Sequence, residues 1–200
     1  MNVIEAIESR RAVKHFDPQV KLTEQEVEFL MEKVILSPTC YNIQNWRFVR
    51  ITSETKRQAM LEAAWGQAQV AEASELFVLC ADVNAWQDRP QRYFANTPPD
   101  VKALMLNMLE DFYQDKTELQ AQEAYRSCGI AAQTMMLVAK SMGYDTCPMM
   151  GFDPGKVAKI INLPDQHLIT MLVVVGKALK PAHPRPGQLP LSEVLVENMF

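Results

Sequence analysis

One stretch constrains the fold more than any other: "CGIAAQTMMLVAKSMG", residues 128–143, is apolar on almost every side if it is helical. A helix at a protein surface normally keeps one polar face, so a helix that is apolar all round belongs in the middle of a structure. It closes a longer helical tract over residues 98–142. A chain of 200 residues, 48% of them hydrophobic, can build a core around such a helix.

Segments of strand character lie on both sides of this tract. "LFVLCA" (76–81) and "ITMLVVV" (169–175) are continuous apolar runs of strand length, which predicts strands covered on both faces. "WRFVRIT" (46–52) alternates and predicts a half-buried strand, and "DTCP" (145–148) predicts a short strand that enters a turn. The pattern indicates three or four strands that alternate with helices around the apolar helix.

Two helix starts are marked by capping residues. Thr23 is followed three residues later by Glu26, the spacing of a capping box, and Ser37-Pro38 should stop that helix. Asp153 and Pro154 suit the N-cap and first position of a short helix. A first short helix is expected to end near "ESRR".

Composition excludes several classes of protein. The formal net charge is −4 and no long basic stripe is present, which argues against a nucleic-acid or anionic-membrane protein. The longest apolar run is far below the roughly 20 residues that span a bilayer. The four cysteines are far apart and include no CxxC pair, so reduced thiols are expected rather than a zinc site or a disulfide framework. These features predict a soluble, cytoplasmic protein.

No repeat or linker divides the chain, so we expect a single domain over residues 1–200. Its tail, "KPAHPRPGQLP" (180–190), is extended by composition because proline fixes the backbone and removes hydrogen-bond donors. An ordered tail of this kind needs a surface to lie against. A partner subunit is the simplest such surface, and we expect residues 180–200 to wrap around it.

The commonest nucleotide and hydrolase signatures are missing. The chain has no GxGxxG, GxxxxGK[ST], GxSxG or HExxH motif. If a phosphate is bound, side chains must hold it. "ESRRAVKHFD" (8–17) places Arg10, Arg11, Lys14 and His15 close together, which suits one small anion. The alternative is that the two arginines are a solvated helix end, favoured by the helix dipole.

Three further segments carry candidate binding groups, each with a structural alternative. The loop "SPTCYNIQNWRF" (37–48) offers amides beside an aromatic ring, or is a polar turn anchored by a buried Trp46. Gln67 and Gln69 in "WGQAQVAEASE" offer amides to a ligand, or are solvated. Met149 and Met150 in "CPMMGFDP" (147–154) contact a ligand, or fill the core.

Taken in order, these segments resemble the FMN-dependent nitroreductase family. The resemblance rests on an Arg-Arg-x-x-Lys-x-Phe-Asp start, an S-P-[ST]-x-x-N-x-Q-x-W loop, a G-Q-x-Q-V-x-E-A segment, "MGYDTCPMMGFDP" and a Pro-Arg tail. It covers nearly the whole chain. It implies a homodimer of α+β subunits in a three-layer α/β/α arrangement, with a mixed, mainly antiparallel sheet, long interface helices, swapped tails and two FMN sites at the interface.

The resemblance also assigns contacts with the flavin. Phosphate, ribityl and pyrimidine contacts would come from Arg10, Arg11, Lys14 and, in the tail, Arg185. Amides for the ribityl chain and the polar edge of the ring would come from Gln67 and Gln69. The isoalloxazine would lie along Pro148, Met149, Met150 and Gly151, with a backbone N–H of Met150 or Gly151 facing flavin N5.

Other contacts would be made with the flavin of the partner subunit. Tyr41 would shape the substrate pocket. The remaining residues implied to approach the partner's flavin are Pro38, Thr39, Cys40, Asn42 and Ser127.

The chain also departs from the family pattern. Ala12 stands where many members have serine, and Asn45 replaces a frequent proline before Trp46. Arg185 is alone where two basic residues are common, and Met150 occupies a position that is acidic in some members. These changes leave the flavin assignment in place and the substrate class open.

The implied activity is transfer of hydride from NADH or NADPH to flavin N5, and then to a flat electrophile such as a nitroaromatic, quinone or enal, by ping-pong exchange through one pocket. No metal and no dedicated catalytic side chain is expected. Two alternatives remain at this stage: a flavin-binding sensor or FMN scavenger with little turnover, and a purely structural dimer.

Overall fold

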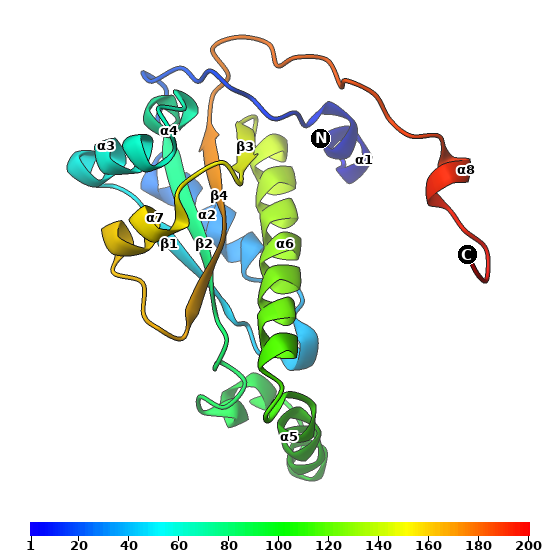
Figure 1. Cartoon of the computed structure of the whole chain (residues 1–200). Helices are drawn as coiled ribbons and strands as arrows, with labels where there is room; N and C mark the ends of the chain where they lie inside the picture. The colour runs from blue at the N-terminus through cyan, green and yellow to red at the C-terminus, as the bar shows by residue number, and fades with distance from the viewer.

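The computed structural model describes residues 1–200, and its centre is a four-stranded sheet of order β1-β2-β4-β3 (Figure 1). All three neighbouring pairs are antiparallel. Ala12 adds a parallel bridge to Thr146, so the N-terminal segment makes the sheet mixed at its edge. The strands are β1 (Trp46–Arg50), β2 (Glu75–Asp82), β3 (Asp145–Met149) and β4 (His167–Gly176).

Helices surround the sheet and connect its strands. The short 3-10 helices are η1 (Cys40–Asn42) and η2 (Pro90–Phe94). The α-helices are α1 (Val3–Ser9), α2 (Glu24–Val34), α3 (Glu54–Ala63), α4 (Gln69–Glu72), α5 (Pro99–Tyr113), α6 (Thr117–Ser141), α7 (Pro154–Ile161) and α8 (Leu191–Val194). None of them combines the length and apolar character that a membrane crossing requires.

Strand β2 is buried along its whole length, as its continuous apolar sequence predicts. Its side chains alternate between two cores, as the twofold period of a strand requires. Leu76 and Val78 belong to a core beneath α3, α4 and α7, which we call the α3–α7 core. Phe77 and Leu79 belong to a core beneath α2 and α6, the α2–α6 core. The sheet is thus the middle layer of an α/β/α arrangement.

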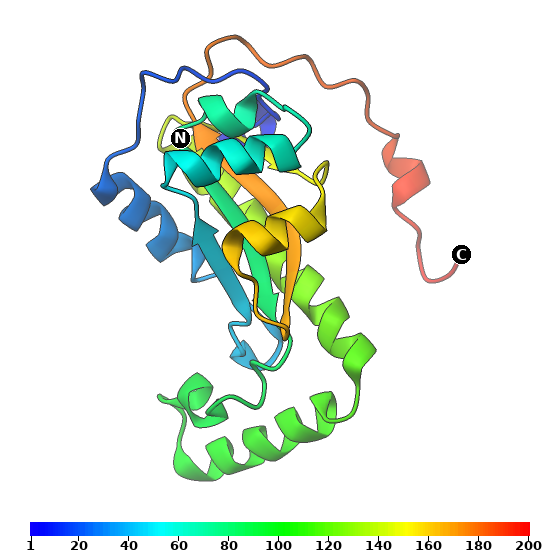
Figure 2. The same ribbon diagram turned by 60° about the vertical axis from the view of Figure 1, so that its left-hand side comes forward.

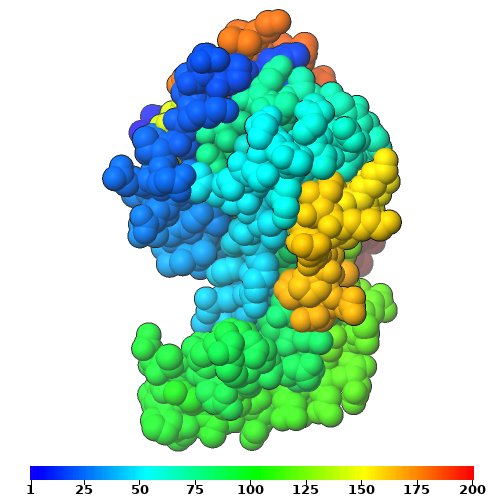
Figure 3. Space-filling view, turned by 90° about the vertical axis from the view of Figure 1, so that its left-hand side faces the viewer, coloured from blue at the N-terminus to red at the C-terminus, as the bar shows by residue number.

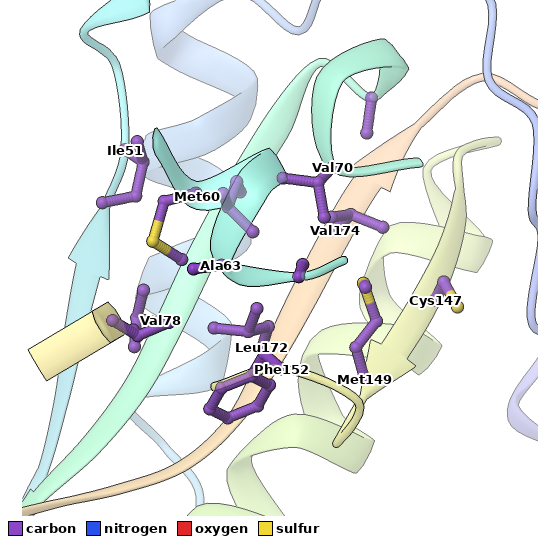
Figure 4. Packing of buried hydrophobic residues seen from close by; sticks show 14 of the residues in the cluster. Ile51, Met60, Ala63, Val70, Val78, Cys147, Met149, Phe152, Leu172 and Val174 are labelled. Atoms are coloured by element: carbon purple, nitrogen blue, oxygen red, sulfur yellow. The ribbon is translucent and has the colours of Figure 1, made fainter. Parts of the chain in front are cut away.

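The α3–α7 core joins segments that are far apart in the sequence (Figure 4). Met60 and Ala63 from α3 meet Val78 and Leu172 from the two central strands. Met149 and Phe152 close the same core from β3 and the turn after it. This turn carries the predicted "CPMMGFDP" segment, so its position is set by core packing.

The long helical tract is two helices rather than one. Helix α5 ends at Tyr113, and α6 begins at Thr117, after Asp115 takes a left-handed backbone conformation (φ 58°). The apolar part of α6 does lie against the sheet, where Ala131, Ala132 and Met135 are buried. Tyr125 and Ile130 on its other side are exposed in the single chain, so one face of this helix has no cover.

Local sequence signals set the helix starts. Thr23 and Glu26 form both hydrogen bonds of the predicted capping box at α2. Asp153 caps α7 by accepting from the backbone N–H of Lys156, with Pro154 at the first position. Asn2 and Glu5 form a further capping box at α1.

The tail after β4 leaves the body of the molecule (Figure 2). In Figures 1 and 2 it runs past α1 and ends in α8, which has no neighbouring element in either view. Leu191 and Val194 of α8 are exposed, as is Phe200 at the end of the chain. Such a segment buries little apolar surface within its own chain.

Gly176 at the end of β4 provides a test of the packing around the sheet. A Cβ at this position would lie 2.9 Å from Cδ1 of Phe16 and 3.0 Å from the backbone N of Ser74. Because neither atom can move freely in the core, Gly176→Ala should lower the free energy of unfolding by about 1–3 kcal/mol. Urea denaturation measures this loss. Gly187→Ala, where nothing lies within 4 Å, is the control, and an equal effect of both substitutions would contradict the packing.

Candidate active site

Four basic side chains gather where α1 ends beside β3 and the tail. Arg10, Arg11, Lys14 and Arg185 form this group, which we call the cation cluster. Arg185 donates from Nη2 to the carbonyl oxygen of Arg10 over 3.3 Å, although 175 positions separate them. None of the four side chains forms an ion pair with a carboxylate. The cluster therefore keeps its positive charge available to an anion.

The electrostatics of Arg10 reflect this crowding. Burial lowers the pKa of its guanidinium, and the positive charges of Arg185 and Arg11 lower the pKa further. An arginine remains charged despite such shifts. Like charges held together without a carboxylate are most easily stabilised by a bound anion.

Two members of the cluster also cap α1. Arg11 donates from Nη1 to the carbonyl oxygens of Glu8 (2.6 Å) and Arg10 (2.8 Å), and Arg185 donates to that of Ile7 (3.0 Å). The alternative of a helix end favoured by the dipole therefore describes part of their role. A guanidinium has five N–H groups, so the same side chain can also bind an anion.

A cysteine lies beneath the cluster. Lys14 donates from Nζ to Sγ of Cys147 over 3.5 Å. Burial raises the pKa of the Cys147 thiol, while Lys14 and Arg10 act in the opposite direction. The sequence gives no signal for this contact, because 133 positions separate the two residues.

The two predicted glutamines lie beside the turn after β3. Gln67 donates from Nε2 to the carbonyl oxygen of Gly151 over 2.6 Å, and Gln69 donates to Oε1 of Gln67 over 3.0 Å. Gln69 is 4% exposed, so the alternative of a solvated glutamine does not hold for it. The pair forms an amide chain that fixes the position of Gly151.

The turn itself separates side chains that face the core from groups that face outward. Met149 is buried in the α3–α7 core, which fits the alternative of core filler for its side chain, whereas Met150 is 66% exposed. Pro148 is partly buried. The backbone N–H groups of Met150 and Gly151 donate to no protein acceptor. They are available to a ligand at the surface of the turn.

Trp65 also lies beside the turn, although no sequence motif predicted it as a candidate. It is 68% exposed, and its ring atom Cζ3 lies 3.3 Å from the point where Gly151 would carry a Cβ. Its backbone is left-handed (φ 56°), next to Gly66. The one signal for it in the sequence is a tryptophan just before the Gly-Gln segment.

A second group of predicted residues lies in the loop 37–44. Thr39 Oγ1 accepts from the backbone N–H of Gln44 over 2.9 Å, and Asn42 Nδ2 donates to the carbonyl oxygen of Tyr93 over 2.8 Å. Pro38 is exposed and Cys40 is partly buried. The ring of Tyr41 packs 5.3 Å from that of Phe112 on α5.

This loop has a strained backbone. Tyr41, Asn42 and Gln44 all have positive φ, between 44° and 54°, although none is glycine. Such conformations persist where the surroundings enforce them, and they concentrate at functional sites. Trp46, 7% exposed, anchors the loop to the sheet as the polar-turn alternative expects.

Ser127 lies on the buried face of α6. It is 1% exposed, and its Oγ has no hydrogen-bond partner. An unpaired hydroxyl is unusual in a protein interior.

The loop and the cation cluster lie at opposite ends of β2 within one chain. Trp46, which follows the loop, pairs with Ala81 near one end of β2. Thr146, beside the cation cluster, pairs with Val175 of β4, which in turn pairs with Glu75 at the other end of β2. Six residues of strand, about 20 Å, separate Glu75 from Ala81. No hydrogen bond or ion pair joins the loop 37–44 to the cation cluster.

Proteins of known sequence match almost the whole chain. Protein DrgA of Synechocystis is 44% identical over 200 residues, which cover 98% of this chain and 95% of that protein. MhqN of Bacillus subtilis, which carries the name of an NAD(P)H nitroreductase, is 30% identical over a match that covers 96% of this chain and 97% of that protein.

A solved structure shows the same fold. It is a protein of Exiguobacterium sibiricum in complex with FMN, 24% identical, with a TM-score of 0.91 over 98% of this chain and 97% of that one. The model of the "Nitroreductase family" matches residues 7–177, which include the cation cluster apart from Arg185, the loop 37–44 and the turn after β3. Because the match spans the sheet and both groups of candidate residues, the chain belongs to the nitroreductase family, as the sequence motifs predict.

Proposed function

We propose that this protein is an FMN-dependent oxidoreductase that takes hydride from NAD(P)H and reduces a flat electrophile. The observation that carries this proposal is the cation cluster without a carboxylate, beside a turn with two unengaged backbone N–H groups. A ligand with a phosphate at one end and a polar aromatic ring at the other would satisfy both the cation cluster and the free N–H groups of the turn. The names and the FMN complex of the related proteins support the same assignment.

The residues present fit an FMN molecule. Arg10, Lys14 and Arg185 offer charged donors for the phosphate, and each charge-assisted bond contributes about 1.5–3 kcal/mol. Gln67 and Gln69 offer amide groups beside the turn. Gly151 leaves open the space beside Trp65 that a Cβ would fill.

When bound, FMN supplies hydride chemistry at N5, accepting from NAD(P)H and passing hydride to an acceptor such as a nitroaromatic, quinone or enal in a ping-pong sequence. The chain's own part is to bind, orient and polarise. The N–H groups of Met150 and Gly151 are fixed donors that favour negative charge on the ring. Trp65 and Tyr41 offer aromatic surfaces to a flat substrate.

A second copy of the chain completes the site in this proposal. The loop 37–44 leads into β1, whereas the turn that would hold the ring follows β3 at the opposite edge of the sheet, and three strand spacings, about 14 Å, separate these edges, so the loop would not reach a ring held by its own chain. In a homodimer the loop and Ser127 of one chain would approach the flavin held by the cation cluster of the other. Exposed apolar residues on α1, α6 and the tail supply an interface, among them Ile4, Ile130 and Leu191.

The purified protein tests the proposal directly. We expect the two-banded absorption spectrum of oxidised flavin, bleached by NADH or NADPH without oxygen, in a particle of twice the 22.7 kDa of one chain by light scattering. Added quinone should accelerate NAD(P)H oxidation, which distinguishes an enzyme from a flavin sensor. A colourless protein would refute the function, and a monomer with tightly bound FMN would refute the shared site.

The phosphate assignment is tested by removing charge from the cluster. Arg10→Ala combined with Arg185→Ala should lower FMN affinity by several kcal/mol, at about 1.5–3 kcal/mol per bond. The affinity for riboflavin, which lacks the phosphate, should fall by less. Titration of the apoprotein by fluorescence measures both affinities. Lys156→Ala, an exposed side chain with no bonded partner, is the control, and equal losses for the two ligands would exclude a phosphate site.

The donor role of the turn is tested at Met150. Met150→Ala keeps the backbone N–H and removes an exposed side chain, so it should retain flavin and most activity. Met150→Pro removes the N–H. By analogy with loss of an oxyanion-hole donor, it should slow flavin reduction by about ten- to a thousandfold, measured by stopped flow at matched flavin content. A fast proline variant would leave Gly151 as the donor, and a slow alanine variant would assign the role to the side chain.

A further inference from the structure

A second cationic group lies at a cavity that the site described above does not include. Arg47, Arg89 and Arg92 line this cavity, whose volume is about 560 Å³. Its walls come from Gln44 and the start of β1, and from η2 with the two residues before it. In Figure 3 the molecule narrows between the part coloured for residues near 45–50 and the lobe coloured for residues near 90–115. We call the cavity the arginine pocket.

Positive charge exceeds negative charge in the arginine pocket. Asp88 accepts from Nε of Arg89 over 3.2 Å and from Nη2 of Arg92 over 2.9 Å. The hydrogen bond from Arg89 lowers the pKa of Asp88, and the charges of Arg89, Arg92 and Arg47 lower it further. Asp82 adds one more carboxylate, 3.4 Å from Arg47. Three guanidinium groups therefore face two carboxylates, both already engaged.

Each arginine keeps a donor that no protein atom accepts. Arg47 uses Nη1 and Nη2, Arg89 uses Nε and Nη2, and Arg92 uses Nη2 alone. Nε of Arg47, Nη1 of Arg89 and both Nε and Nη1 of Arg92 have no partner. Guanidinium groups with free N–H atoms around one cavity suit the oxygens of a phosphate.

The pocket adjoins the loop 37–44. Gln44 belongs to both, since it lines the pocket, and its Nε2 donates to the carbonyl oxygen of Asn42 over 3.3 Å. Asn42 in turn bonds to the backbone of Tyr93, whose side chain also lines the pocket. A ligand that reaches out past the loop would meet the arginine pocket at the edge of the active site.

We propose that the arginine pocket binds the 2′-phosphate of NADPH and makes NADPH the preferred hydride donor. This inference rests on the proposed function. A dinucleotide with its nicotinamide at the active site carries its adenosine outward, toward an exposed group such as Arg89, which is 76% exposed. A phosphate monoester carries close to two negative charges at neutral pH, more than either phosphate of the pyrophosphate bridge, and so best matches three arginines.

Binding without turnover gives the first test. Calorimetry with the flavin-loaded protein should show that adenosine 2′,5′-bisphosphate binds more tightly than 5′-AMP. Arg89→Gln combined with Arg92→Gln should lower the affinity for the bisphosphate by about tenfold or more, since one charge-assisted bond contributes that factor. The affinity for 5′-AMP should fall by much less. Arg47 is left in place because it also binds the loop carbonyls of Gln44 and Trp46.

Kinetics give the second test. In the double variant, kcat/KM for NADPH should fall at least about tenfold relative to kcat/KM for NADH, mainly through KM. Arg92→Lys keeps the charge and loses the planar fork of the guanidinium. Its ratio of kcat/KM for NADPH to kcat/KM for NADH should lie between the ratios of the wild type and Arg92→Gln. The control is Lys156→Gln, which removes one surface charge and should leave the ratio unchanged. Circular dichroism and flavin content verify that each variant is folded.

Three results would overturn the inference. They are equal affinity for the bisphosphate and 5′-AMP, equal kinetic losses with NADH and NADPH, and inorganic phosphate binding as tightly as the bisphosphate, which indicates a general anion site. Failure of the proposed function is seen separately, as a protein without flavin or without NAD(P)H oxidation. In that case calorimetry with the protein as purified still measures binding of the bisphosphate and of 5′-AMP to the arginine pocket.

Discussion

Burial of β2 between two helical layers is the constraint on which the rest of the structure depends. Its alternating side chains contribute to both cores. Full burial of a leucine, valine or phenylalanine side chain contributes about 1.5–3 kcal/mol to the stability of the fold. Arg50 reinforces the start of the strand, because it donates to Glu75 and also to Glu24 on α2. The strand therefore cannot shift its register without exposing both cores.

The same strand sets the distance between the two halves of the proposed site. The cation cluster lies near one end of the sheet, the turn after β3 lies beside its middle, and the loop 37–44 leads into β1 at the other end. The loop is held rigidly, with three left-handed residues and a hydrogen bond from Asn42 to the carbonyl oxygen of Tyr93 in η2. In the proposed homodimer these rigid elements would meet across two chains, and the exposed tail and the uncovered face of α6 would lie at the interface.

Charge is distributed unevenly on this acidic protein. A net charge of −4 conceals two places where arginines outnumber carboxylates. In the cation cluster no carboxylate pairs with the basic groups, whereas in the arginine pocket two carboxylates hold three arginines in position. The first arrangement suits a permanently bound anion. The second suits an exchanging one, because the carboxylates stabilise the empty pocket.

The sequence by itself determined the elements and the family. Period-two and all-apolar runs predicted the strands, the Thr23–Glu26 pair predicted the start of α2, and the order of the motifs identified the nitroreductases. These signals are local, so they can be recognised without a fold. Tertiary structure alone decided which groups meet: Arg185 with Arg10, Lys14 with Cys147, Trp65 with Gly151, and Arg47 with Arg89 and Arg92 around one cavity. Such contacts join residues as far as 175 positions apart, and the packing of the two cores, rather than any local pattern, brings them together.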